Sequence, residues 1–378
     1  MFGSHLSIAG GMVHALTRAR ELGLDTVQVF TKNQQQWKAP PLDPGASRDW
    51  LTELRALGWE GRTVSHASYL INLASPDDAL WRKSIDLMRD EIERCEALSI
   101  PFLVHHPGAF TTSSREAGID RIARAYKELF ASTRGYRTVS CLEGTVGSGS
   151  NLGGTFEDLR DLRAAILSLT PAPERVGFCL DTCHVHASGV DLATRASARA
   201  ALKAADELFG LAHVRVLHLN DSMAPMGSHR DRHAHIGAGT IGLGPIHAGA
   251  KSHPLNPAPE PDPDLSDTGF AEVLRHPVLA GLPKILETPK DDAAPGMPWD
   301  LINLRRLRAA AGLEAIAAPA PNSNLAARAA PMQSAVPKPA PAPVKKVSAK
   351  AKRPAASKRT NTVRSTTSGP ARAPRRKR

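Results

Sequence analysis

The chain has 378 residues, 42% of them hydrophobic, so it can hold one large domain or two ordinary ones around a sizeable core. Its formal net charge of +11 arises in residues 315–378, which carry 7 Lys, 8 Arg and no acidic residue and leave 33 basic against 37 acidic residues elsewhere. Four cysteines without a C-x-x-C pair exclude a disulfide framework and predict buried, reduced thiols.

Short β-type runs alternate with helical patterns along the chain. Strands are predicted at Phe2–Leu6, Thr26–Phe30, Arg62–Ala67, Phe102–His106, Thr138–Gly144, Val176–Thr182, Val214–Asn220 and Lys284–Thr288. Helices are predicted near residues 11–23, 46–58, 77–98, 115–133, 155–168, 193–209, 267–276 and 298–312. Eight of each is the count of a (β/α)8 barrel, an α/β fold. A doubly wound open sheet competes, but its nucleotide-binding form needs a G-x-G-x-x-G turn where Gly3-Ser4-His5 stands.

The regular spacing breaks between the last two strands. Residues 246–267 carry five prolines, which favour neither helix nor central strand, so we expect an exposed insertion there. Residues 315–378 hold almost no large apolar residues, so we expect them to be disordered and the barrel domain to span residues 1–314. No signal peptide or spanning apolar segment is visible, and we expect a soluble, cytoplasmic protein (nucleoid-associated if bacterial) without a membrane partner.

Residues of metal-binding types gather at the carboxyl ends of the predicted strands and in the loops that follow. They are His66, His106, Glu143, Asp181, His184, His218, Asp231, His233 and Glu287. Barrel enzymes keep their chemistry at this rim, and no predicted helix supplies any of these groups. Imidazoles and carboxylates suit zinc or a similar divalent ion. The set is too large for one ion, so we predict two or three, a common arrangement for phosphoester hydrolysis.

Two other polar features are given structural explanations. His105 precedes His106 on a strand, where neighbours alternate, so we expect it to point away from the barrel mouth. The glycine-rich run at residues 147–154 is compatible with an anion-binding nest. It lacks the Gly-Lys-Ser/Thr of a P-loop, however, and a flexible loop is the favoured interpretation.

Several short signatures of the chain match a known family. In chain order they are GSHLSIAGG, FTKNQ, HASYLINLA, HHPG, LEGTVGSGSNLG, DTCH, HLND, DRHAHIG and ILET. On these motifs the chain, from about Gly3 to Leu313, resembles the endonuclease IV family of apurinic/apyrimidinic DNA repair nucleases. The resemblance implies a (β/α)8 barrel with three divalent metal ions, zinc in the first place and manganese as an alternative at some sites.

The resemblance also implies how the ligands are shared among the ions. One ion would be held by His66, His106 and Glu143. Glu143, as the catalytic bridging residue, would also reach a second ion held by Asp181, His218 and Glu287. A third ion would be held by His184, Asp231 and His233.

DNA contacts are implied in the same way. Tyr69 and Leu70 correspond to residues that push into the DNA where the damaged nucleotide is flipped out, and Arg232 lies beside the DNA backbone. Gln35 stands where an arginine that enters the DNA is common. The other departures from the family pattern are Ala67 for an acidic residue, Gly144 for an asparagine and Ala238 for the glutamate of H-x-G-E-G.

The implied activity is hydrolysis of the phosphodiester 5′ to an abasic site, which leaves a 3′-hydroxyl and a 5′-deoxyribose phosphate. Extruding a nucleotide that lacks a base costs less than flipping a normal one, which selects damage without recognising sequence. The expected partner is double-stranded DNA with abasic sites, bound by a monomer. Residues 315–378 are either a nonspecific DNA tether or a solubilising appendage.

Two other classes of protein stay open. A sugar isomerase or epimerase of the same barrel superfamily uses similar ligands at the rim but needs fewer metals. A DNA-binding barrel without metal would depend on its basic tail. Metal content separates the three classes, since the nuclease needs about three ions per chain, the isomerase about one and the binding protein none.

Overall fold

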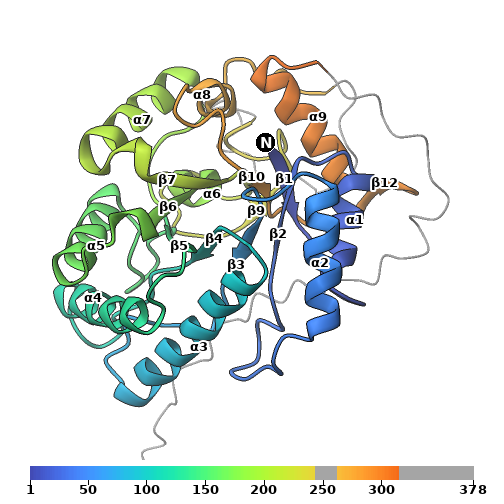
Figure 1. The fold of residues 1–378 in the computed structure, drawn as a ribbon. Helices are drawn as coiled ribbons and strands as arrows, with labels where there is room; N and C mark the ends of the chain where they lie inside the picture. Colours follow the sequence, from blue (N-terminus) through green and yellow to red (C-terminus); the bar gives the residue numbers. More distant parts are fainter. Residues whose placement is uncertain (243–261, 315–378) are drawn as a thin grey trace, which may run out of the picture. The chain divides into compact units, whose positions relative to one another are not determined.

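Eight parallel strands form a closed barrel in the computed structural model, which describes residues 1–242 and 262–314. Their order is β1-β10-β7-β6-β5-β4-β3-β2 (Figure 1). The strands are β1 Phe2–His5, β2 Thr26–Val29, β3 Val64–His66, β4 Phe102–His105, β5 Val139–Glu143, β6 Val176–Asp181, β7 Val214–His218 and β10 Lys284–Leu286. The predicted (β/α)8 barrel is confirmed. An open sheet is excluded because β1 pairs with both β2 and β10.

Helices surround the barrel on its outer side (Figure 1). They are α1 Val13–Glu21, α2 Pro44–Ala56, α3 Asp78–Ala97, α4 Arg115–Ser132, α5 Phe156–Leu169, α7 Arg195–Phe209, α8 Gly269–Arg275 and α9 Trp299–Ala311. Side-chain caps fix where several of them begin. The Asp77 carboxylate accepts a hydrogen bond of 2.8 Å from Leu80 N at the start of α3, and Ser114 caps α4 through Ala117 N.

Several short elements were not predicted from the sequence. They are α6 Thr182–Ala187, β8 Asp221–Ser222, β9 His233–Ala234, β11 Asp292–Ala294, β12 Met297–Pro298 and two 3-10 turns at Pro173–Arg175 and Leu211–His213. Elements of two to six residues are too short to show a helical or alternating pattern. The hairpin of β8 and β9 and the helix α6 matter most, because both lie among the predicted ligands.

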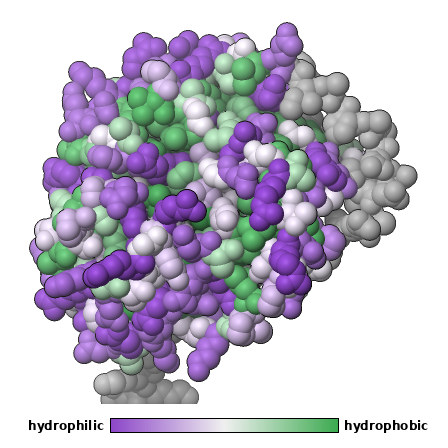
Figure 2. Space-filling view, in the orientation of Figure 1, coloured by the Kyte–Doolittle hydropathy of each residue, from purple (hydrophilic) through white to green (hydrophobic). Residues whose placement is uncertain are grey.

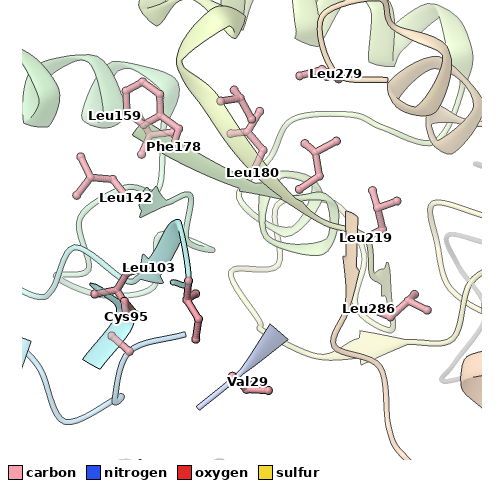
Figure 3. Packing of buried hydrophobic residues seen from close by; sticks show 14 of the residues in the cluster. Val29, Cys95, Leu103, Leu142, Leu159, Phe178, Leu180, Leu219, Leu279 and Leu286 are labelled. Carbon is pink, nitrogen blue, oxygen red and sulfur yellow. The ribbon is translucent and has the colours of Figure 1, made fainter. Parts of the chain in front are cut away.

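Alternation along the strands separates two apolar clusters. The smaller one lies inside the barrel and consists of Val64, Val104, Cys141, Cys179, Val216 and Ile285. The strand residues Leu103, Leu142 and Phe178 point outward and pack with helix residues such as Cys95 and Leu159 (Figure 3). All four cysteines are buried and free, as predicted.

The segment predicted to be an exposed insertion, residues 246–267, is described only from residue 262 onward. The prediction is wrong at Leu265, which is 3% exposed. The neighbouring Asp262 pairs with the buried Arg306 of α9, which holds this end of the segment against the barrel body. Residues 246–261 and the tail predicted to be disordered, residues 315–378, lie outside the described residues.

Hydrophilic residues dominate the face of the molecule seen in Figure 2, and hydrophobic residues lie among them in small groups. This distribution is ordinary for a protein surface. Within residues 1–242 and 262–314, no helix is long and apolar enough to cross a membrane.

Candidate metal centre

Strand ends bring six of the predicted ligands to one end of the barrel. Four of them are the last residues of β3, β5, β6 and β7, namely His66, Glu143, Asp181 and His218, and two directly follow β4 and β10, namely His106 and Glu287. Asp181 lies opposite His218 in the register between β6 and β7. Because the strands are parallel, all their carboxyl ends open on the same rim.

The other three ligands come from two short elements. His184 lies in α6, whose N-cap is Asp181, and the Asp181 carboxylate accepts a hydrogen bond of 3.0 Å from His184 N. The prediction that no helix supplies a ligand is therefore wrong for His184. His233 is the first residue of β9, in the hairpin that follows β7, and Asp231 lies two residues before it.

The two carboxylate oxygens of Glu143 face different histidines. Oε2 lies 3.1 Å from His66 Nε2 and 3.3 Å from His106 Nε2. Oε1 lies 3.0 Å from His218 Nδ1 and 3.4 Å from His184 Nδ1. The Glu143 side chain is 1% exposed, so water does not compete for these oxygens. Such a carboxylate is suited to bridge two cations.

His218 is surrounded by further carboxylates. Its Nδ1 lies 3.1 Å from Glu287 Oε2 and 3.8 Å from Asp181 Oδ2. With Glu143, these residues bring four ligand atoms within 4.8 Å of one another. Three carboxylates and one imidazole in so small a space need positive charge between them.

Asp231 lies between two imidazole nitrogens. Its Oδ2 is 3.3 Å from His184 Nε2, and its Oδ1 is 3.3 Å from His233 Nε2. Both nitrogens are buried, and neither makes a hydrogen bond within the described residues. Two ligands bound tetrahedrally to one zinc ion at about 2.1 Å stand about 3.4 Å apart. The spacing therefore fits shared cations better than it fits hydrogen bonds.

The crowded carboxylates change the proton affinity of this centre. Burial alone lowers the pKa of His218, but Cys179, Glu287 and Glu143 raise the His218 pKa well above its usual value. Burial alone raises the pKa of Glu143, yet His218 and His106 hold the Glu143 pKa well below its usual value. A divalent cation must displace protons from such imidazoles, so metal binding weakens as the pH falls.

Two buried amides, which the sequence analysis missed, orient the ligands. Gln28 Oε1 lies 2.9 Å from His218 Nε2, which leaves Nδ1 facing the carboxylates, and Gln28 Nε2 donates to Glu287 Oε1 at 2.6 Å. Asn220 Nδ2 donates to Asp181 Oδ2 at 2.7 Å, and Asn220 Oδ1 accepts from Glu287 N at 2.8 Å. The available signal for Gln28 was an amide between the two valines of β2.

Asp221 ties the hairpin that carries Asp231 and His233 to the loop that follows it. Its carboxylate accepts hydrogen bonds of 2.8 to 3.1 Å from the backbone N–H groups of Ser222, Gly237, Gly239, Ile241 and Gly242. The loop must come very close, because a Cβ on Gly239 would lie 2.5 Å from Asp221 Oδ1. A buried aspartate of β8 thus anchors the backbone on both sides of the ligand-bearing hairpin.

The residues predicted to contact DNA lie next to this centre or on neighbouring loops. Tyr69 is 52% exposed, and its ring lies 5.0 Å from the His66 ring. Leu70 is half-buried, and Gln35 is exposed on the loop after β2. Arg232 is exposed between two predicted ligands, and its Nη1 donates to Asp231 O at 2.6 Å.

Two residues that depart from the family pattern, Ala67 and Gly144, lie beside predicted ligands. Their main-chain oxygens contact the imidazoles of these ligands. His66 Nδ1 lies 2.7 Å from Ala67 O, and His184 Nδ1 lies 2.9 Å from Gly144 O. Main-chain oxygens therefore orient both imidazoles whatever the side chain. Ala238 N donates to His235 O in the turn after the hairpin.

The remaining sequence predictions near the site concern His105 and the glycine-rich run. His105 points away from the metal centre, as predicted, with Nε2 2.7 Å from Tyr126 OH of α4. Within the glycine-rich run, Gly153 N and Gly154 N both donate to Asp158 Oδ2, so these two N–H groups are not free for an anion.

The sequence of this chain is similar to those of known proteins. The family model for the xylose isomerase-like TIM barrel matches residues 16–253. A probable endonuclease 4 of Chloroflexus aurantiacus is 41% identical over 307 residues, which cover 81% of this chain and 96% of that protein. The chain belongs to the endonuclease IV family. A probable endonuclease 4 of Trichlorobacter lovleyi is 38% identical over a stretch that covers 81% of this chain and 98% of that protein.

Solved structures agree with membership of the endonuclease IV family. Endonuclease IV from Thermus thermophilus aligns with a TM-score of 0.65 at 32% identity, over 82% of this chain and 98% of that chain. A D-tagatose 3-epimerase-like protein aligns with a TM-score of 0.57 at 17% identity, over 82% of this chain and 96% of that chain. At that identity the epimerase likeness shows the fold alone, whereas the endonuclease IV likeness extends to the sequence.

Proposed function

We propose that this protein is a metal-dependent DNA repair endonuclease, which hydrolyses the phosphodiester 5′ to an abasic site and leaves a 3′-hydroxyl and a 5′-deoxyribose phosphate. Membership of the endonuclease IV family supports a DNA-cleaving hydrolase. The observation that carries the proposal is the position of Glu143, whose two oxygens face different sets of histidines. Ligand sets that share a carboxylate are a usual device for phosphodiester hydrolysis.

The proposed ligands form three sets. Two of them are His66, His106 and Glu143, and Glu143, Asp181, His218 and Glu287, whose ligand atoms lie within 4.8 Å of one another. The third is His184, Asp231 and His233, in which Asp231 lies 3.3 Å from each imidazole. Nitrogen and oxygen donors suit zinc and allow manganese. Divalent ions held by these residues would lower the pKa of a bound water toward about 7 and would stabilise charge on the leaving oxygen. Three such ions and four carboxylates leave a formal charge of about +2, which attracts phosphate to an otherwise acidic barrel.

Residues of the chain itself select the damaged nucleotide in this proposal. The exposed ring of Tyr69 stands 5.0 Å from His66, so an aromatic side chain borders the proposed metal centre. When Tyr69 and Leu70 enter the duplex, an abasic nucleotide leaves the stack at lower cost than a normal one. The displaced backbone then lies next to the proposed ligands, with Arg232 available to bind a phosphate.

Elemental analysis and an incision assay test the proposal together. We expect about three divalent ions per chain, incision of an abasic-site duplex, loss of incision on chelation and recovery when zinc or manganese is returned. An intact duplex of the same sequence is the control and stays uncut. Incision that is indifferent to metal would overturn the mechanism. One ion per chain with turnover of a ketose sugar would favour the isomerase or epimerase, and DNA binding without any metal would favour a binding protein.

The basic tail is proposed to tether the enzyme to DNA without recognising sequence. Deleting residues 319–378 removes 15 cations and no anion. We expect duplex binding at low salt to weaken by about tenfold or more and its salt dependence to flatten, because fewer counterions are released. Incision at saturating DNA and low salt should persist. A full-length variant with these cations changed to glutamine is the matched control, and unchanged binding in both variants leaves the tail as a solubilising appendage.

A further inference from the structure

A group of charged and polar residues, buried except for Asp90, lies behind the two loops that carry Gln35 and Tyr69. We call it the loop-anchoring cluster, and its members are Thr31, Lys32, Ser68, Asp90, Glu91 and Arg94. Thr31 and Lys32 follow β2, Ser68 immediately precedes Tyr69, and the other three lie on α3. None of them belongs to the proposed ligand sets.

Glu91 is the acceptor that the two loops share. Its Oε2 accepts a hydrogen bond of 3.1 Å from Thr31 Oγ1, and its Oε1 accepts one of 3.2 Å from Ser68 N. The Glu91 side chain is only 2% exposed. A buried carboxylate needs such partners, so each loop is held in the position that satisfies it.

Two cations of the cluster complete the connection to α3. Lys32 is 3% exposed, and its Nζ pairs with Asp90 and lies 3.4 Å from Glu91 Oε1. Arg94 Nε donates to Asp90 at 3.0 Å, and the Arg94 guanidinium also donates to Thr31 O and to Pro40 O further along the same loop. Several strong contacts thus tie the loop after β2 to a rigid helix.

Ser68 carries the connection to the residues proposed to enter DNA. Its Oγ donates to Gln34 O at 2.6 Å, one residue before Gln35. The same Oγ accepts a hydrogen bond of 3.2 Å from Leu70 N. Glu91, Ser68 and the two loops therefore form one hydrogen-bonded unit, although the loops lie more than thirty residues apart in the chain.

We propose that Glu91, supported by Lys32, is a positioning residue that holds the Gln35 loop and the Tyr69–Leu70 loop together in the shape that enters damaged DNA. This inference rests on the proposed function. Loops that are already ordered lose less conformational entropy on binding, so their inserted side chains contribute more to affinity. Selection of abasic over intact duplex is strengthened because only the abasic duplex admits both loops without displacing a base.

Glu91→Gln tests the proposal in the holoenzyme, because an amide keeps the shape but weakens the pairing with Lys32. We expect the KM for an abasic-analogue duplex to rise about tenfold, kcat to stay within about twofold, and affinity for intact duplex to be unchanged. Metal content should equal that of the wild type. Glu272→Gln is the matched control, since Glu272 is likewise a helical glutamate held in ion pairs, with Arg195 and Arg199 on α7.

Ser68→Ala is the second variant, which removes one hydroxyl and leaves the charges intact. We expect a smaller rise in KM in the same direction and faster amide hydrogen exchange in residues 31–36 and 68–72. In a Tyr69→Ala background, Glu91→Gln should raise KM by less than half the factor seen in the wild type, because both changes act through the same loop. The inference would be overturned if the Glu91→Gln enzyme folds and shows unchanged KM and unchanged hydrogen exchange. It would also be overturned if Glu91→Gln lowers the metal content, or if the fall in kcat accounts for the whole fall in kcat/KM.

The exchange measurement also separates this inference from the proposed function. If the wild-type enzyme fails to cut abasic DNA, the proposed function fails. Faster exchange in both loops of Glu91→Gln, with Glu272→Gln unchanged, would still support the anchoring role in that case. If the wild type cuts abasic DNA and exchange is unaffected by Glu91→Gln, the anchoring role alone fails.

Discussion

Glu143→Gln is expected to lower the rate of abasic-site incision by about a thousandfold or more. An amide cannot offer two negatively charged oxygens, and Glu143 Oε2 and Oε1 face His66 and His218 respectively. Charge stabilisation by a bridged metal pair amounts to several kcal/mol, and each 1.36 kcal/mol is about tenfold in rate. The measurement is single-turnover incision of an abasic duplex with excess enzyme, so weak binding does not limit the rate.

Metal content gives a second, independent readout for Glu143→Gln. Two of the three proposed sets include Glu143, whereas the set of His184, Asp231 and His233 does not. We expect the content to fall from about three divalent ions per chain to about one. Glu272→Gln should keep full metal and activity. A Glu143→Gln protein that retains all its metal would contradict the bridging role.

Asp221→Asn is expected to lower the free energy of unfolding by about 3 kcal/mol at pH 7. Burial raises the pKa of Asp221 to about 6 against the opposing effect of its N–H donors, so the group is ionised at neutral pH. The wild-type carboxylate accepts hydrogen bonds from backbone N–H groups. An asparagine at this position replaces one carboxylate oxygen by an NH2 group, which cannot accept these bonds, so some buried N–H donors lose their partners. Urea unfolding, followed by far-ultraviolet circular dichroism, measures the change.

The raised pKa of Asp221 also fixes the sign of its pH dependence. Because its folded-state pKa is near 6 and the unfolded value is about 3.9, the native state binds this proton more tightly. Protonation of Asp221 therefore raises the free energy of unfolding at low pH, and this stabilisation is lost as the pH rises through 6. Asparagine does not titrate and lacks this contribution, so the destabilisation caused by Asp221→Asn should be larger at pH 5 than at pH 7. Asp264→Asn, on an exposed turn, is the control and should be neutral at both.

Local sequence patterns were sufficient to predict the barrel and the shared rim of ligands. An apolar run that ends on His66, Glu143 or His218 predicts both a buried strand and a metal-binding type of residue at its end. Since parallel strands in a barrel end on one rim, side chains far apart in sequence could be placed together without coordinates. The family motifs added a proposed division of these residues among three ions, which the residues alone left open.

The two wrong predictions, for His184 and for Leu265, share a physical cause. Six residues of α6 show no helical period, so His184 was expected in a loop. Leu265 follows a proline-rich run whose composition predicts exposure, yet Asp262 pairs with Arg306 on α9 and brings Leu265 into the core. Both were decided by partners distant in sequence rather than by the local pattern.

Sequence alone predicted which side chains form the candidate site and at which end of the barrel they meet, because strand periodicity is a local property. Only the tertiary structure decided which oxygen of Glu143 faces which histidine, how Gln28 and Asn220 orient the ligands, and how Asp221 and Glu91 anchor the loops. Those arrangements depend on hydrogen bonds and ion pairs between distant segments. Buried polar groups must find partners wherever packing places them, so these contacts could not be predicted from the local sequence pattern.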